Sequence, residues 1–447
     1  MTPLVIDIET TIKNKDVGDF LADPEYPDNW IVAYGWQLGD DPIEVVYAPI
    51  KTSGTLLAAP EIGSDVIVVG QNVAFDLYFL ARRSSEWRDF IGWGSIWDTM
   101  IVHYLITGQF EKYVNLDILA LIAAGADQIE IEYYKQIPKL KAQALKLHDD
   151  GDLLTSHAIQ SQIAAFYDRW EGVLKDNAMK EYWEAGIQTE DIPREELLDY
   201  LKGDVRNTKA VFEYQLNIVQ QMDLFSLVWV QMEARMATLE MQLNGTYINM
   251  EILDELATKR KIEQFNAVLT VKNSIMEIQG YSGDSFLLEA LNAGSPYQLS
   301  CALFGGTCTF SKRETMLDEN GLIIRFKSGA RKGEVRRQVV KVDYTFNQIA
   351  DAVVYSTPTK TVGVYKTGDE VLKKIIDECK NPDAVKLAKD IIALREINKD
   401  VSTYYEGYST LVWPHDSCIH PSYQHCSTDT GRLSCSKPNL QQVTGKG

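Results

Sequence analysis

Acidic side chains lie inside otherwise apolar segments of this chain, and this placement restricts its fold more than any other feature. Asp7 and Glu9 belong to the strand-like run Leu-Val-Ile-Asp-Ile-Glu-Thr, and Asp76 ends Asn-Val-Ala-Phe-Asp. Tyr200 and Asp204 occur together in Tyr-Leu-Lys-Gly-Asp. Carboxylates are rarely buried unless a partner or a metal ion neutralises them. The sequence therefore favours a fold in which these acids meet at a pair of divalent cations.

The spacing of these residues predicts which faces they share. Residues two apart on a strand point to the same side, so Asp7 and Glu9 do. Residues four apart on a helix stack, so Tyr200 and Asp204 share a face, and Asp204 falls on the apolar stripe of that helix. Oxygen ligands suit Mg²⁺ or Mn²⁺. Two such ions would activate a water and stabilise the leaving oxygen of a phosphodiester, with Tyr200 orienting the water.

Each of these motifs has an ordinary structural explanation when it is taken alone. Asp-x-Glu on a strand is more often a solvated edge, Asn-x-x-Phe-Asp is a common helix start, and Tyr-x-x-x-Asp is frequent by chance. Asn72 is expected to cap the helix that carries Asp76. The order of the motifs along the chain, each on a fitting element, is the stronger signal for catalysis.

Composition bounds the class of protein. A chain of 447 residues with 45% hydrophobic and 24% charged residues is typical of a soluble protein of two or three domains. The net charge of −19 argues against a nucleic-acid partner. However, residues 1–220 hold 36 acidic and 18 basic side chains, the remainder is nearly balanced, and 312–341 holds nine basic and four acidic ones. Two interpretations of that basic stretch stay open: contact with the phosphates of a nucleic acid, or a charged, exposed hairpin. Charge alone therefore does not decide whether the partner is a nucleic acid.

The location expected from the sequence is cytoplasmic. Its six cysteines include no Cys-x-x-Cys pair, which fits reduced thiols better than a disulfide framework. No apolar run approaches the roughly 18 residues of a spanning helix, and the first residues lack a basic region followed by an apolar one. We therefore expect no membrane partner.

The pattern of apolar residues predicts a strand-rich sheet with packed helices, followed by a largely helical half. The predicted strands are Leu4–Glu9, Ile31–Leu38, Ile43–Ala48 and Val66–Gly70. The predicted helices cover Trp97–Leu105, Leu116–Ala124, residues 138–190, a segment that begins after Pro193, Leu227–Leu243 and Val371–Lys399, and residues 322–344 are predicted to form a β-hairpin.

The order of the acidic motifs resembles that of the proofreading 3′–5′ exonucleases with an Asp-Glu-Asp-Asp-Tyr active site on a ribonuclease H-like fold. The resemblance covers about residues 1–215. It implies two Mg²⁺ or Mn²⁺ ions and places Thr10 and Asn72 near the 3′ nucleotide, while Asp98 is structural. The implied metal ligands and catalytic residues are Asp7, Glu9, Asp76 and Asp204, with Tyr200 as the fifth catalytic residue.

Motifs in the second half resemble family A DNA polymerases, of the DNA polymerase I type. Residues 427–443 are similar to the segment that opens the palm, 395–404 and 295–304 to thumb motifs, and 233–249 to the beginning of the polymerase domain. The resemblance implies that Arg432 enters the minor groove at the primer terminus, where it can donate to acceptors that every base pair offers. From residue type alone, a surface salt bridge would be the better interpretation of Arg432. The other implied DNA contacts are Asn439 and Gln441 near the template or minor groove, and Lys399, Ser402, Thr403 and Tyr404 on the duplex backbone.

The expected division is an α/β ribonuclease H-like exonuclease domain at 1–220 and the first part of a polymerase domain at 221–447. The first domain has a mixed sheet flanked by helices and a helical insertion at about 130–190. The second contains a mainly α-helical thumb and the start of a palm. The family's palm carboxylates and fingers helix would lie beyond position 447. The resemblance thus implies a truncated or split polymerase that does not transfer nucleotides alone.

The function expected from the two resemblances is proofreading of the primer 3′ end in DNA replication. The partners would be DNA and a second polypeptide carrying palm and fingers. A phage origin is expected, which would put the protein in the host cytoplasm. Two alternatives stay open: a non-catalytic DNA-binding or assembly subunit of a split polymerase, and a free-standing 3′–5′ exonuclease.

A group of histidines and cysteines near the end of the chain has ligand types that suit zinc. Its spacing is irregular, and its segment is similar to the strand region that precedes Thr-Gly-Arg in the polymerase family. The sequence therefore disfavours a zinc site formed by His415, Cys418, His420, His425 and Cys426.

Overall fold

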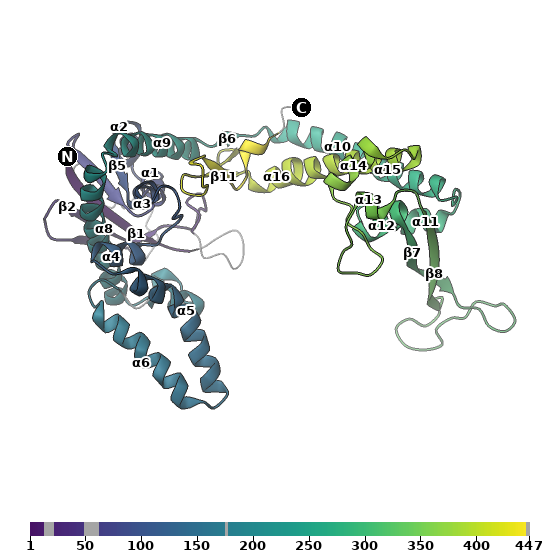
Figure 1. Ribbon diagram of the computed structural model, residues 1–447, viewed down its shortest axis with the longest axis horizontal. Coiled ribbons are helices and arrows are strands. Elements are labelled where there is room, and N and C mark those ends of the chain that lie inside the picture. The colour runs from purple at the N-terminus through teal and green to yellow at the C-terminus, as the bar shows by residue number, and fades with distance from the viewer. Residues whose placement is uncertain (13–21, 49–61, 175–177, 444–447) are drawn as a thin grey trace. The chain divides into compact units, whose positions relative to one another are not determined.

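The computed structural model describes residues 1–12, 22–48, 62–174 and 178–443. The chain divides into two compact units (Figure 1). Unit 1 contains Met1–Tyr247 together with Val412–Gly447, and unit 2 contains Ile248–Leu411. The segment similar to the opening of a polymerase palm therefore belongs to the same compact unit as the acidic motifs. The expected boundary between functional domains at 220/221 stays a prediction, because compact units and functional domains need not coincide.

Unit 1 is built on a five-stranded sheet of order β3-β2-β1-β4-β5. β1 pairs antiparallel with β2, β2 antiparallel with β3, and the pairs β1–β4 and β4–β5 are parallel. The expectation of a mixed sheet flanked by helices is confirmed, as are all four predicted strands. β5 was not predicted, because its four residues give too short a pattern. The strands are β1 Thr2–Thr10, β2 Ile31–Leu38, β3 Glu44–Tyr47, β4 Val66–Gly70 and β5 Ser95–Asp98.

Helices from two parts of unit 1 pack on this sheet (Figure 1). Helix α8 contacts β1, β2 and β4, whereas α9 contacts β5, α1 and α2. The large core cluster joins buried side chains from the strands to those of the helices, including Trp87 and Trp97. The bounds are α1 Ala74–Ala81, α2 Ser85–Trp93, α3 Thr99–Ile106, α8 Arg194–Gln221 and α9 Phe225–Asn244.

Helix α8 forms where the sequence predicts it. Pro193 precedes its first residue and two glutamates lie in its first turn, where the partial positive charge of a helix N-terminus favours them. Its buried face includes Leu197, Leu201, Asp204 and Val205. Further along, the side chain of Gln215 accepts a hydrogen bond from Trp97 Nε1 at 3.0 Å and donates one to a backbone carbonyl at 2.7 Å. These contacts fix the helix against β5 and α3.

A largely helical stretch lies between α3 and α8. Within it, α5 and α6 run side by side as a long hairpin (Figure 1). The side chains of Asp127 and Glu130 form a reciprocal capping box at the start of α5. The elements of this stretch are α4 Leu116–Ala123, α5 Gln128–Asp149, α6 Leu153–Arg169, α7 Ala178–Glu184 and the short 3₁₀ helix η1 Thr189–Asp191.

The last described residues return to unit 1 as short strands. β6 (Thr246–Tyr247) pairs with β9 (Cys418–Ile419), and β10 (Ser422–Gln424) pairs with β11 (Ser434–Ser436). β10 contacts α9, and η3 (Leu440–Gln442) follows β11.

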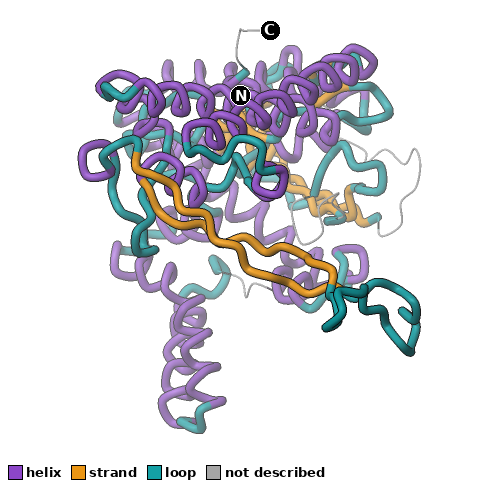
Figure 2. The backbone as a smooth tube through the Cα atoms, turned by 90° about the vertical axis from the view of Figure 1, so that its right-hand side faces the viewer, coloured by secondary structure: helices purple, strands orange, loops and turns teal. Residues whose placement is uncertain are grey.

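Unit 2 is mainly helical, with its own core of buried apolar side chains and one long antiparallel hairpin of β7 and β8 (Figure 2). In the part of the chain that the structure describes, no helix is both long enough and apolar enough to cross a membrane. The elements of unit 2 are α10 Met250–Ile278, α11 Ser285–Ala290, α12 Pro296–Phe304, β7 Gly305–Thr315, β8 Arg337–Gln348, α13 Ala352–Tyr355, α14 Asp369–Glu378, α15 Pro382–Lys399, the π-helix η2 Asp400–Glu406 and α16 Gly407–Leu411.

Several local predictions were wrong in part. Trp97 and Asp98, which were predicted to begin a helix, belong to β5, and residues 138–190, predicted to be wholly helical, contain a turn between α5 and α6. The hairpin predicted at 322–344 has a local turn, with Arg325 bridged to Val335, but Arg337–Phe346 of β8 pair with the earlier strand β7. The helix predicted at 371–399 is two helices, because Asn381 caps a new one with a proline in its first turn. Finally, α1 is preceded by Val73, without a side-chain cap, because Asn72 adopts a left-handed conformation (φ 54°).

Substitution of Gly35 in β2 tests whether α8 packs closely against the sheet. A Cβ atom at this position would lie 3.0 Å from Leu201 Cγ and 3.2 Å from Val205 Cγ2. We expect Gly35→Val to lower the free energy of unfolding by about 1–3 kcal/mol, because the added methyl groups overpack this contact. Urea denaturation would measure the change.

Gly92→Ala is the matched control, because a Cβ atom there meets nothing within 4 Å and Gly92 lies within α2. It should leave stability unchanged or raise it by about 0.5–1 kcal/mol. An unaltered free energy of unfolding in Gly35→Val would contradict the close approach of α8.

Candidate metal centre and nucleic-acid interface

Three of the predicted carboxylates converge in unit 1. Oxygen atoms of Asp7, Glu9 and Asp204 all lie within 4.8 Å of one another. Asp7 and Glu9 extend from the same face of β1, as their spacing predicts, and Asp204 reaches them from α8. Asp204 is 8% exposed and Glu9 9% exposed. We call this set the carboxylate cluster.

The pairing of β1 with β2 explains how α8 brings Asp204 close to Asp7 and Glu9. Asp7 lies opposite Gly35 in the antiparallel register. Because Gly35 has no side chain, Leu201 packs directly over the strand, at a distance that any larger residue would obstruct. Asp204 follows Leu201 by about one helical turn and therefore faces β1.

Asp76 lies beside the carboxylate cluster and is held by the backbone of β1. Its Oδ1 atom accepts a hydrogen bond of 3.1 Å from the backbone N–H of Ile8, the residue between Asp7 and Glu9. Asp76 is 4% exposed, and this burial raises its pKa well above the usual value, with the charges of Asp98 and Glu9 adding to the rise. A buried carboxyl with such neighbours is stabilised as a carboxylate by a bound cation.

Tyr200 shares the environment of these carboxylates. Its pKa is raised by burial first and then by the charges of Asp204, Glu9, Asp117 and Asp7, in that order. The phenol therefore stays protonated at neutral pH and keeps a hydrogen that it can donate. The structure thus brings all five predicted catalytic residues into one neighbourhood.

The donor set fits a divalent cation of the Mg²⁺ or Mn²⁺ type. Every available ligand atom in the carboxylate cluster is an oxygen, and these ions prefer carboxylate oxygens. Without a cation, negative charges would accumulate in a partly buried place, at a large electrostatic cost. Asp7, Glu9 and Asp204, with Asp76 beside them, are the residues that would hold the ions.

Thr10 and Asn72 lie next to the acidic motifs. Thr10 is buried at the end of β1, where the pairing with β2 shifts by a residue after Glu9. The backbone N–H of Asn72 donates to Asp98 Oδ1 at 3.1 Å. Asp98 is fully buried and also accepts from two backbone N–H groups at the start of α3. Asp98 therefore joins the turn before α1 to α3, which is a structural arrangement.

The segment that contains Arg432 is fixed to the α/β body of unit 1 through its backbone. Tyr104 Oη donates to the carbonyl of Thr428 at 2.6 Å, and the buried Arg235 donates to the carbonyl of Tyr423 at 3.0 Å. Lys112 and Asp429 form an ion pair of 2.5 Å. Two contacts to carbonyl groups and one ion pair thus hold the segment.

The predicted DNA-contacting residues of this segment have different local roles. Arg432 is exposed, and its carbonyl accepts from Thr428 Oγ1 at 2.9 Å. Asn439 Oδ1 accepts from the backbone N–H of Gln441 at 3.1 Å, and Gln441 Nε2 donates to the carbonyl of Leu433 at 3.2 Å. Asn439 and Gln441 therefore shape the turn that follows Arg432.

The other predicted DNA contacts lie in unit 2, where α15 continues into η2. Lys399, Ser402 and Thr403 are exposed, whereas Tyr404 is half-buried. The ring of Tyr404 packs edge-on against Tyr408 with centroids 5.7 Å apart. Three polar groups on one helix end are available to a ligand, but their contact with DNA stays a prediction.

Sequence reasoning missed one cluster of possible ligands. His415 and His420 do come together, but with Glu25 and Asp416 in place of the cysteines and His425. His425 Nε2 lies 2.9 Å from Thr238 Oγ1 instead. Glu25 is 390 residues from His415 in the sequence, so no local pattern could have connected them.

His425 gives a pH-dependent test of how the Arg432 segment is attached. Burial, with the neighbouring charge of Arg235, lowers the pKa of His425 to about 4. In the unfolded chain the His425 ring has a pKa of about 6.5, so as pH falls the unfolded state binds a proton before the folded state does. The contribution of the neutral His425 ring to the free energy of unfolding is therefore present above pH 6.5 and is lost as pH falls towards 4. Over this window the wild type should lose about 1–3 kcal/mol more than His425→Gln, measured by urea denaturation.

His148→Gln is the control, because His148 is exposed. Its stability should follow the wild type over the whole pH range. Parallel curves for wild type and His425→Gln would show that His425 is not buried as a neutral ring.

Comparison with known proteins gives matches along the chain. Residues 342–447 match the model of DNA polymerase family A. The DNA polymerase I of Geobacillus stearothermophilus is 27% identical over 207 residues, which cover 46% of this chain and 17% of that protein. That of Bacillus subtilis is 35% identical over 98 residues, which cover 22% of this chain and 10% of that protein. The chain thus spans less than a fifth of the length of these relatives.

A solved structure resembles the whole chain. It is described as the POL domain of Pol1 from M. smegmatis in complex with DNA primer-template and dNTP. The two share a TM-score of 0.52 and 15% identity, over 100% of this chain and 53% of that one, which shows a likeness of fold alone. The match of residues 342–447 and the DNA polymerase I relatives together show that this part of the chain is similar to the polymerase domain of family A DNA polymerases.

Proposed function

We propose that this chain is a metal-dependent 3′–5′ exonuclease that removes nucleotides from DNA 3′ ends as the proofreading component of a family A DNA polymerase. The observation that carries the proposal is the convergence of Asp7, Glu9 and Asp204, with Asp76 held beside them by the backbone of β1. These side chains come from distant parts of the sequence. Convergence of four acids in a partly buried place raises the cost of keeping them all charged, and bound divalent cations lower that cost.

The residues of this neighbourhood divide the chemistry between them. The carboxylates of Asp7, Glu9, Asp76 and Asp204 hold the ions, which when bound lower the pKa of a water and neutralise charge on the phosphate. Tyr200, with its raised pKa, acts as a hydrogen-bond donor that orients the attacking water towards the phosphorus. The burial of Asp204 and Asp76 limits competing water around the reacting groups.

DNA contacts are proposed for the residues that lie outside the carboxylate cluster. Thr10 and Asn72 flank the acidic motifs and would contact the 3′ nucleotide. In the polymerase-like parts, the candidates are Lys399, Ser402, Thr403, Tyr404, Arg432, Asn439 and Gln441. The net charge of −19 means that phosphate binding depends on local basic groups such as Lys399 and Arg432, and it should weaken steeply with salt. The solved relative with bound primer-template supports this part of the proposal.

A non-catalytic DNA-binding subunit is the second candidate. The exposed polar groups at the α15–η2 junction and the exposed Arg432 would serve such a role as well. The carboxylate cluster favours catalysis, because a protein that only binds polyanionic DNA gains nothing from collecting buried acids. A second polypeptide that supplies palm and fingers stays a prediction from the sequence.

Loss of two ligands tests the exonuclease directly. We expect Asp7→Asn/Glu9→Gln to reduce degradation of a 3′ single-stranded DNA oligonucleotide by about 100-fold or more in Mg²⁺, because the cluster can no longer hold the ions. The measurement is the rate at which a 5′-labelled substrate shortens. Asp199→Asn is the control, since Asp199 lies on α8 next to Tyr200 but is 79% exposed. Equal rates for wild type and the double variant, or no degradation by the wild type, would refute the exonuclease.

Tyr200→Phe separates orientation of the water from ion binding. Removing the hydroxyl should lower kcat by about 10-fold or more while leaving KM and Mn²⁺ affinity nearly unchanged. The control is Tyr214→Phe, a half-buried tyrosine of the same helix. An unaltered kcat would remove Tyr200 from the mechanism, and a loss of Mn²⁺ affinity would assign it to the metal site.

A further inference from the structure

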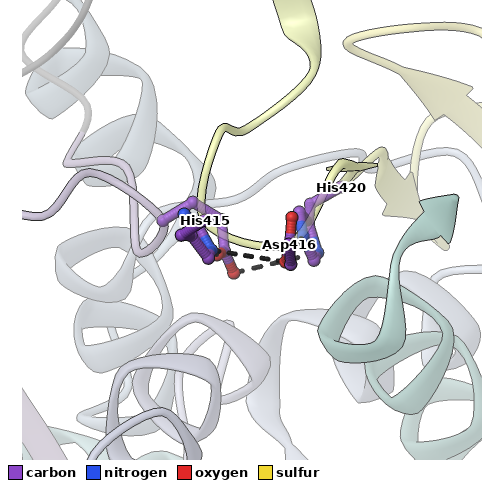
Figure 3. A group of neighbouring side chains, drawn as sticks. His415, Asp416 and His420 are labelled. Carbon is purple, nitrogen blue, oxygen red and sulfur yellow. Dashed lines mark hydrogen bonds and ion pairs between the residues drawn. The ribbon is translucent and has the colours of Figure 1, made fainter. Parts of the chain in front are cut away.

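A second group of ligand-type side chains lies in unit 1, with none of the proposed exonuclease residues among its members. Nitrogen and oxygen atoms of Glu25, His415, Asp416 and His420 all lie within 4.8 Å of one another. His415, Asp416 and His420 come from the turn before β9 and the residue after it, and their polar ends point towards one another (Figure 3). Glu25 belongs to the segment that precedes β2. We call these four residues the His-carboxylate cluster.

The spacing of the polar atoms matches that of ligands around a small ion. His420 Nε2 lies 2.9 Å from Asp416 Oδ2, and His415 Nε2 lies 3.3 Å from the same oxygen. His415 Nε2 is also 3.2 Å from Glu25 Oε2. Ligands at the usual zinc distances of about 2.0–2.1 Å in a tetrahedron are separated by about 3.3 Å. Only small movements of the side chains are therefore needed to enclose an ion.

A hydrogen bond to the backbone orients the ring of His420. His420 Nδ1 lies 2.6 Å from the carbonyl of Gln242, which can only accept, so Nδ1 carries the proton. In the neutral ring, the lone pair of Nε2 then faces the carboxylate of Asp416. Two acceptors at 2.9 Å repel one another unless positive charge lies close to both. Arg82, with a nitrogen 3.5 Å from Nε2 and 3.9 Å from Asp416 Oδ2, supplies part of that charge from one side, and a bound ion would supply the rest. A histidine whose second nitrogen donates to a backbone carbonyl is the usual arrangement of a metal ligand.

Glu25 is oriented in a corresponding way. Its Oε1 atom accepts from Tyr78 Oη at 2.7 Å and from Arg82 Nε at 2.6 Å, which leaves Oε2 directed at His415. The side chains of Glu25 and His420 are only 3% and 2% exposed. The single positive charge of Arg82 is shared between the two carboxylates, because its guanidinium pairs with Glu25 and lies 3.9 Å from Asp416 Oδ2.

We propose that Glu25, His415, Asp416 and His420 bind one Zn²⁺ ion as a structural site. Four protein ligands of nitrogen and oxygen type leave no open position, as in structural rather than catalytic zinc sites. The ion would join the segment before β2 to the turn that leads into β10, β11 and Arg432. This site is separate from the carboxylate cluster and does not depend on the proposed exonuclease.

Protonation of both histidines is the competing explanation, because two imidazolium rings would satisfy the same contacts without a metal. The two explanations differ in whether zinc is taken up, because a neutral imidazole nitrogen is a metal ligand and an imidazolium ring is not. The experiment is performed at pH 8, where few protons compete with the ion for the ligands.

The test measures zinc bound to the full chain carrying Asp7→Asn/Glu9→Gln, so that the carboxylate cluster does not take the ion. This parent is stripped with a chelator, dialysed against Zn²⁺ and analysed by elemental mass spectrometry. Two variants are compared with it: His415→Ala, at an exposed position, and Asp416→Asn, which changes a single atom. His148→Ala, at an exposed histidine elsewhere, is the matched control.

We expect about one zinc per chain in the parent and the control, and at least a 10-fold loss of affinity in both variants. Zinc should also raise the unfolding temperature of the parent but not of Asp416→Asn. Absence of bound zinc in the parent, or equal zinc in parent and Asp416→Asn, would overturn the proposal. Because Asp416→Asn retains the size of the side chain, it decides the result even if His415→Ala does not fold.

Discussion

The close packing of α8 over β1 and β2 is the contact on which the candidate site depends. Gly35 lies opposite Asp7 in the strand register and leaves room for Leu201. That approach carries Asp204 to the side of the sheet from which Asp7 and Glu9 extend. The helix thus contributes both the apolar side chains that hold it and the carboxylate that completes the cluster, so packing and chemistry cannot be altered independently here.

The burial of acidic groups at the contact between α8 and the sheet points to a function. The pKa of Asp76 is raised mainly by burial, and the pKa of Tyr200 is raised by burial and by the neighbouring carboxylates. A fold that only needed stability would fill these positions with apolar side chains. Divalent cations would offset the free-energy cost of burying charged carboxylates, because they favour the charged form of every acid around them. The same logic applies to the His-carboxylate cluster, where Asp416 faces two imidazole nitrogens.

Much of unit 1 could be predicted from the sequence because its signals are local. β1, β2 and β4 are rich in β-branched and aromatic residues, and α8 has a clear start at Pro193 and a continuous apolar stripe. Four of the five catalytic candidates share faces because their spacing along β1 and α8 fixes them, and Asp76 joins them from α1. Features that depend on distant partners could not be predicted: the pairing of β7 with β8 in place of the local hairpin, and the contact of Glu25 with His415 across 390 residues.

The central claim is that Asp7, Glu9 and Asp204 form a binding site for divalent cations, and crystallography can test it with few assumptions. Crystals of the wild-type chain soaked in Mn²⁺ would be measured at a wavelength where manganese scatters anomalously. The account predicts an anomalous peak within bonding distance of carboxylate oxygens from both β1 and α8, about 2.0–2.6 Å as for hard divalent ions. An anomalous map with manganese elsewhere, and none between these three carboxylates, would contradict it.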